Sequence, residues 1–111
     1  MDGMQTHMED RWQRIDQIFN SLETRINALN QNSASRAQNS TVAHLDRLFP
    51  LVNASTSENI PEFPETPAVL SRMTNATINR VLLALGSNTD GTIEVKRNRL
   101  STTIGLRVGG V

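Results

Sequence analysis

The stretch Met8–Leu29, MEDRWQRIDQIFNSLETRINAL, carries the strongest pattern in the chain and decides the fold. Two rows of apolar residues repeat every seven positions, one row at 12, 19 and 26 and the other at 8, 15, 22 and 29. In a heptad written abcdefg these rows take positions a and d, so they share one helix face and keep facing a partner helix. Neither glycine nor proline interrupts the stretch. The pattern predicts a coiled coil that self-associates through Met8, Trp12, Ile15, Phe19, Leu22, Ile26 and Leu29.

An apolar stripe of this kind needs to be covered. A single helix of this length is only marginally stable in water, and this one places Trp12 and Phe19 on one face. One way to cover the stripe is packing against the same helix in further copies of the chain. The alternative is that the helix packs against the C-terminal part of its own chain.

Charged residues beside the stripe indicate how the copies are oriented. The e positions are acidic at 9, 16 and 23, and the g positions include Arg11 and Arg25. Parallel helices place a g residue opposite the partner's e residue, so Arg11 meets Asp16 of a second copy, whereas antiparallel helices set acid against acid. The charges therefore predict a parallel homo-oligomer. Aromatic residues at a, with Ile18 at g, suit three or four strands at least as well as two, so we expect two to four chains.

Composition limits what the rest of the chain does. With 111 residues and 37% hydrophobic content, the chain has room for one small domain and an appendage, and oligomerisation would supplement so small a core. The absence of cysteine excludes disulfides and thiolate zinc sites. No apolar run approaches the roughly 20 residues that span a bilayer, and the N-terminus lacks the layout of a signal peptide. We therefore expect an intracellular protein, cytoplasmic or nuclear, with no membrane partner.

Three regions follow from these patterns: an oligomerising coiled coil over 1–30, a polar linker over 31–44 and a small helical domain over 45–111. The linker residues are short, polar and non-periodic, although a helical continuation is the open alternative. Val42–Val52 predicts one or two helical turns that end at Pro50. Ile60–Pro64 is expected to be extended because each proline pushes its predecessor out of the helical region.

Three further helices are expected, which makes the fold class all-α. Thr66 and Pro67 form a good start for a short helix that ends near residue 73. A second helix covers 77–85, where apolar residues recur at helical spacing, and Gly86 stops it. Thr92 can cap a third helix, from Ile93 to about residue 103, with Lys96, Arg97 and Arg99 on its outer side.

The two last helices and the loop between them resemble the SAP motif, a small helix–extension–helix module usually associated with DNA binding. The resemblance covers about 73–106 and rests on Met73, Ile78, Leu82, Gly86, Gly91, Arg99 and Leu100. It departs from the family at Ser87, where the family has an apolar residue, and at Ile93, where the family has a lysine. The resemblance implies a helical module that contacts DNA phosphates.

The segment before this module, together with the N-terminal coiled coil, is similar to a group of small filamentous-fungal proteins. Pro50–Asn53 and Ile60–Pro67 carry that similarity. The resemblance implies an intracellular accessory protein without an activity of its own.

The residues that carry chemistry favour binding over catalysis. The chain has two histidines and no cysteine or tyrosine, and it lacks a nucleophile elbow and a phosphate-binding loop. We expect no enzyme activity, no cofactor, no metal and no small-molecule substrate. A cluster of basic residues can instead neutralise phosphates without reading sequence. The candidate nucleic-acid-binding residues are Arg80, Lys96, Arg97, Arg99 and Arg107. The competing hypothesis is a structural or adaptor protein that displays its C-terminal domain to an unidentified protein partner.

Overall fold

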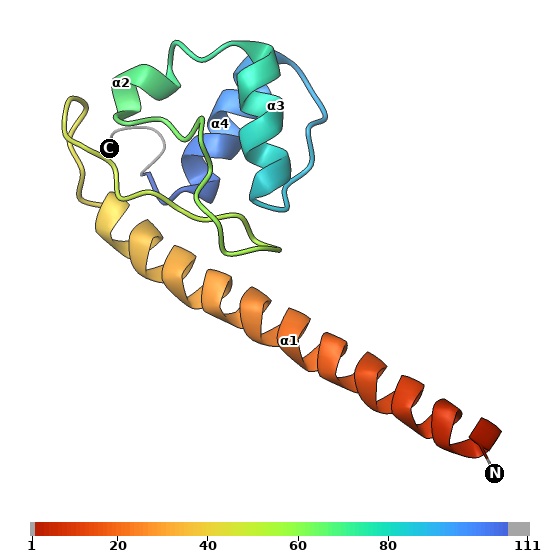
Figure 1. Ribbon diagram of the computed structural model, residues 1–111. Coiled ribbons are helices and arrows are strands. Elements are labelled where there is room, and N and C mark those ends of the chain that lie inside the picture. Colours follow the sequence, from red (N-terminus) through yellow and green to blue (C-terminus); the bar gives the residue numbers. More distant parts are fainter. Residues whose placement is uncertain (1, 107–111) are drawn as a thin grey trace.

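A computed structural model describes the backbone of residues 2–106 and the side chains of residues 9–106. Within these residues the secondary structure consists of four helices and one isolated bridge between Val52 and Asn59. The all-α prediction is therefore confirmed. The molecule measures 67 × 27 × 22 Å, because one long helix projects from a small globular part (Figure 1).

The long helix, α1, spans Asp2–Asn39 and carries the predicted heptad pattern. It continues through residues 31–39, so the expectation of a flexible linker there is wrong and the alternative of a helical continuation is confirmed. The physical reason lies in three polar side chains of that segment, Asn32, Ser35 and Asn39. They recur at helical spacing on the face that meets the globular part, where all three are buried. We call these three residues the polar lock.

The polar lock binds the backbone of an extended segment, residues 49–52. The Asn32 amide donates to the Val52 carbonyl at 2.9 Å and accepts from the Val52 N–H at 2.7 Å. The Asn39 amide makes the same pair of bonds with Phe49, at 3.0 and 2.7 Å. Between them, the Ser35 hydroxyl donates to the Pro50 carbonyl at 3.0 Å. Side chains of a helix thus take the place of a neighbouring β-strand.

This arrangement explains why Val42–Val52 forms turns and extended chain where helical turns were expected. The backbone groups of Phe49 and Val52 bond to α1, and a helix would have used them internally. The expectation of fully extended chain over residues 60–64 is also wrong, because Phe63 N–H donates to the Ile60 carbonyl at 3.1 Å and closes a turn.

The remaining helices are α2 (Pro67–Leu70), α3 (Asn75–Ala84) and α4 (Ile93–Thr103). Threonine hydroxyls cap the starts of α2 and α4 as predicted, at Thr66 and Thr92. Gly86 ends α3 with φ of +76°, and the Ser87 N–H donates back to the Leu82 carbonyl at 2.9 Å. The bounds of α4 are those expected. The helix α3 begins two residues and ends one residue earlier than expected, and α2 ends three residues earlier.

The hydrophobic core lies between α2, α3, α4 and the segment 48–63, and α1 contributes no residue to it. Its buried members are Leu48, Leu51, Ile60, Leu70, Met73, Ile78, Val81, Leu82, Leu100 and Ile104. The main apolar cluster of the domain therefore comes from other parts of the chain, and α1 adds the fully buried Ala28 where it docks. Gly105 lies at this docking site, where an added Cβ would come within 2.3 Å of the Arg36 carbonyl oxygen.

Candidate self-association surface

The predicted self-association residues form one exposed apolar stripe on α1. Trp12 and Phe19 are each 61% exposed, and Leu29 at the other end of the stripe is 62% exposed. Ile15, Leu22 and Ile26 are exposed along the same rows, and the predicted g residue Ile18 widens the stripe. The Met8 side chain lies outside the described residues. The described members of the set are therefore brought together on one surface, and each is accessible to a partner.

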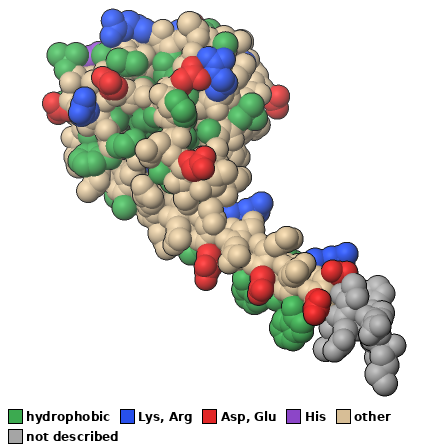
Figure 2. Space-filling view, viewed as in Figure 1, with side chains coloured by type: hydrophobic (Ala, Val, Ile, Leu, Met, Phe, Trp, Pro, Cys, Tyr) green, Lys and Arg blue, Asp and Glu red, His purple; other side chains and the backbone are tan. Residues whose placement is uncertain are grey.

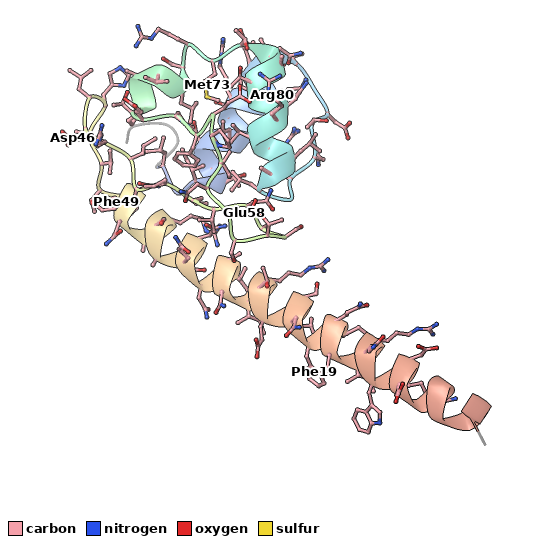
Figure 3. All side chains as sticks on the ribbon, in the orientation of Figure 1. Phe19, Asp46, Phe49, Glu58, Met73 and Arg80 are labelled. Atoms are coloured by element: carbon pink, nitrogen blue, oxygen red, sulfur yellow. The ribbon has the colours of Figure 1, made fainter. Side chains whose placement is uncertain are left out.

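The stripe and the docking face lie on opposite sides of α1. At about 100° per residue, Ala28, Asn32, Ser35 and Asn39 share one side, and the a and d rows lie across the helix axis from it. Figure 3 shows Phe19 pointing away from the globular part. In Figure 2 hydrophobic side chains gather on that same outer side of the projecting helix. The described residues of the domain leave the stripe uncovered.

The charged residues beside the stripe are exposed and available. Glu9, Arg11, Asp16, Glu23 and Arg25 are all exposed. Among the side chains that the structure describes, the one ion pair joins Arg80 to Glu62, so the described charges of α1 form no ion pair with other described residues. They remain available to the e and g positions of another helix.

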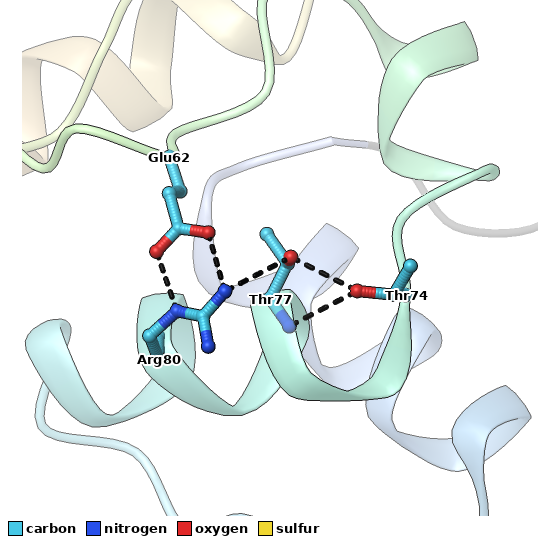
Figure 4. Close-up of polar contacts among 4 residues, drawn as sticks. All are labelled: Glu62, Thr74, Thr77 and Arg80. Carbon is cyan, nitrogen blue, oxygen red and sulfur yellow. Dashed lines mark hydrogen bonds and ion pairs between the residues drawn. The ribbon is translucent and has the colours of Figure 1, made fainter.

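The predicted basic residues are engaged within the domain. Arg80 donates to both carboxylate oxygens of Glu62, at 2.5 and 2.7 Å, and also to the Thr77 hydroxyl (Figure 4). The hydrogen bond between Arg80 and Glu62 lowers the pKa of Glu62 and raises the pKa of Arg80. This pair attaches the turn at residues 60–63 to α3.

Lys96 does not lie on the outer side of α4, where it was expected. It is buried, and its ammonium group donates to the Asn75 side-chain oxygen at 2.9 Å. The cause is the close packing of α4 against the start of α3, which leaves the apolar stem inside and brings the charged end to a polar side chain.

The other basic residues have separate partners. Arg97 donates to the Met73 carbonyl at 3.2 Å, Arg99 donates to the Asn88 carbonyl at 3.1 Å, and both are half-buried. Arg107 lies outside the described residues. The four described cations thus donate to four different groups of the domain. Nucleic-acid binding through them stays a prediction.

Other kinds of site find little support in the described residues. Residues 9–106 contain no group of three or more histidine or acidic side chains placed to hold a metal ion. Within the part of the chain that the structure describes, no helix is both long enough and apolar enough to cross a bilayer. His44, the histidine within this part, is exposed on a loop.

Sequence reasoning missed the polar lock. Its signal was present in the spacing of Asn32, Ser35 and Asn39, which follows a helical period through a segment that composition alone suggested was a linker.

Comparison with known proteins gives no family for this geometry: no family model, curated protein or solved structure matches the chain. The resemblances to the SAP motif and to small fungal proteins therefore stay predictions.

Proposed function

We propose that this protein is a non-enzymatic homo-oligomeric adaptor, which self-associates through α1 and displays its helical domain to another protein. The observation that carries the proposal is the exposed apolar stripe, which repeats every seven residues and is left uncovered by residues 9–106 of its own chain. A soluble chain seldom leaves such a contiguous surface without a partner.

The stripe is large enough to support association. Burying one large apolar side chain completely contributes about 1.5–3 kcal/mol. The described stripe has seven such side chains, each exposed by 39–62%, so covering them contributes roughly 5–10 kcal/mol per chain. Two or more chains together offset the 4–15 kcal/mol that association costs in lost freedom. Assembly at micromolar concentration is the expected result.

Charge complementarity favours a second copy of the chain, in parallel orientation, as the partner that covers the apolar stripe. Arg11 at a g position meets Asp16 of that copy at e, whereas antiparallel helices would oppose acidic e positions. The next a and d positions after Leu29 are Ser33 and Arg36, so the apolar pairing ends there. The domains, docked on the other face of α1, then project outward at one end of the bundle.

The displayed domains give the assembly its binding function. Several copies at one end of a stalk raise the affinity for a partner that offers several sites, because later contacts form within one complex. The partner in this proposal is a protein, and the surface that meets it is the part of the domain that α1 leaves uncovered.

Light scattering after size exclusion tests the assembly. We expect the wild-type chain to have two to four times the mass of one chain at micromolar concentration, and Phe19→Asp to have the mass of one. Gln17→Asp is the matched control, because it adds the same charge to the opposite, exposed face of α1. A folded wild-type monomer, or a Phe19→Asp variant of unchanged mass, would refute the proposal.

A single cysteine tests the orientation, since the chain has none of its own. Leu22→Cys places a thiol at d, which faces the same residue of the partner only in parallel, in-register helices. We expect this variant to form a disulfide-linked dimer under mild oxidation and Gln17→Cys to form much less. Equal yields from both variants would contradict the parallel arrangement.

Pull-down tests the display. The wild-type chain should retain a protein partner that Phe19→Asp loses and Gln17→Asp keeps. Equal capture by the monomeric variant would contradict display that depends on assembly.

A further inference from the structure

The two faces of α1 are both used within the same two helical turns. In residues 24–29, the Thr24 carbonyl accepts a 2.8 Å hydrogen bond from the Ser57 hydroxyl, and Ala28 is completely buried against the domain. Ile26 and Leu29, which alternate with them, lie on the exposed stripe. The surface for a second copy and the surface for the domain therefore lie on different faces of the same turns of α1.

We propose that assembly and domain docking are coupled through these shared turns, so that pairing of α1 with other copies strengthens the attachment of the domain to α1. The proposal rests on the proposed self-association and adds a conformational consequence to it.

The physical basis is the instability of the unsupported part of α1. Every described side chain from residue 9 to residue 23 is exposed, so no described residue of the domain packs against this part to hold it helical. An isolated helix frays from its free end, and fraying that reaches Thr24 and Ala28 removes their contacts with the domain. Partner helices paired as far as Leu29 suppress that fraying. Docking is therefore stronger in the oligomer.

Linkage makes the effect reciprocal. If assembly strengthens docking by some factor, docking strengthens assembly by the same factor. Weakening the polar lock with Asn39→Ala should therefore raise the dissociation constant of the oligomer, although Asn39 lies outside the apolar stripe.

Backbone amide exchange reports docking directly. The N–H groups of Phe49 and Val52 donate to Asn39 and Asn32 of α1, at 2.7 Å each, so they lose protection when α1 leaves the domain. The Lys96 N–H, which donates to the Thr92 carbonyl at the start of α4, is an internal control that does not depend on α1.

The test compares exchange in the full-length wild-type chain at concentrations well above and well below its dissociation constant. We expect the amides of Phe49 and Val52 to exchange at least ten-fold faster in the dissociated chain, with less than a two-fold change at Lys96. The Phe19→Asp variant should match the dissociated wild type, and Gln17→Asp should match the oligomer. The dilution series needs no substitution, so it decides the question even if a variant misfolds.

A second variant tests whether the coupling depends on the continuous helix of α1. A Gly-Ser-Gly insertion between Glu23 and Thr24 leaves the first part of the stripe able to pair but breaks the continuous helix. We expect this chain to assemble with Phe49 and Val52 exchanging as in the monomer. Slow exchange in the assembled insertion variant would overturn the coupling.

The outcomes separate the two proposals. Equal exchange at Phe49 and Val52 in oligomer and dissociated chain would overturn the coupling and leave the adaptor proposal standing. A wild-type chain that stays monomeric at every concentration would overturn both.

Discussion

Replacing Asn39 with alanine should destabilise this protein more than any other single truncation of a polar side chain on α1. Asn39 is completely buried, and its amide makes three hydrogen bonds. It donates to the carbonyls of Phe49 and Ile104 at 3.0 and 2.8 Å, and it accepts from the Phe49 N–H at 2.7 Å. One side chain therefore joins the end of α1 to both the extended segment and the end of α4.

The expected loss of stability follows from the polar groups that the substitution leaves without partners. Asn39→Ala removes the partner of one N–H and two carbonyl groups, and a buried polar group without a partner costs about 1–3 kcal/mol. Alanine returns up to about 0.7 kcal/mol through its higher helix propensity, and water reaches Phe49 because that side chain is partly exposed. We expect a net loss of about 3 kcal/mol, a large share of the 5–15 kcal/mol typical of a folded domain.

Urea unfolding at one fixed chain concentration measures this loss, because the stability of an oligomer depends on concentration. With a slope of about 1–3 kcal/mol per molar urea, the midpoint should fall by roughly 1–3 M. Asn27→Ala is the matched control, since Asn27 is an exposed asparagine on the same helix. Its stability should change by less than about 0.7 kcal/mol. Equal midpoints for the two variants would refute the assignment of Asn39 as the central docking residue.

Four further substitutions have expected outcomes that unfolding experiments check. Gly105→Ala should lower the free energy of unfolding by about 3 kcal/mol or more, since the added Cβ would lie 2.3 Å from the α1 backbone. Gly86→Ala, whose nearest contact would be at 3.7 Å, should lower it by about 1–2 kcal/mol because of the positive φ alone. Similar losses for the two variants would show that α1 is not closely docked at Gly105. Thr92→Ala should cost about 1 kcal/mol by removing the N-cap of α4, and no loss would contradict that cap. Because Arg80 lowers the pKa of Glu62 in the folded state, the pair stabilises the fold above the ordinary carboxyl pKa of 4.5, and this contribution disappears as the pH falls through the lowered value. Glu62→Gln should therefore reduce the difference in urea midpoint between pH 7 and pH 3, and an unchanged difference would contradict the pair's contribution.

Features that depend on neighbouring residues could be predicted from the sequence. A hydroxyl at Thr66 or Thr92 caps a helix that begins one residue later, and Gly86 ends α3 through bonds that span a few residues. The heptad rows of α1 follow from the period of one helix. These elements were predicted because their interactions lie within about one turn of the chain.

The candidate functional residues divide in the same way. The described members of the apolar stripe are exposed together, as expected, because helical period alone decides which of them share a face. Their role in self-association stays a prediction. The partners of the basic residues could not be predicted, because Lys96 donates to Asn75, 21 positions away, and Arg80 donates to Glu62, 18 positions away. Nucleic-acid binding through these residues stays a prediction.

By itself the sequence determined that this chain is helical, where α2 and α4 begin, and that α1 carries one apolar stripe. Only the tertiary structure decided that residues 31–39 continue α1, that residues 49–52 are extended, and that the described residues of the domain leave the stripe uncovered. Asn39 shows the reason, since its bond to the Ile104 carbonyl joins residues 65 positions apart. A polar side chain in a short segment is equally suited to a linker or to a buried contact. The distant backbone groups that it meets in the fold decide which of the two it becomes.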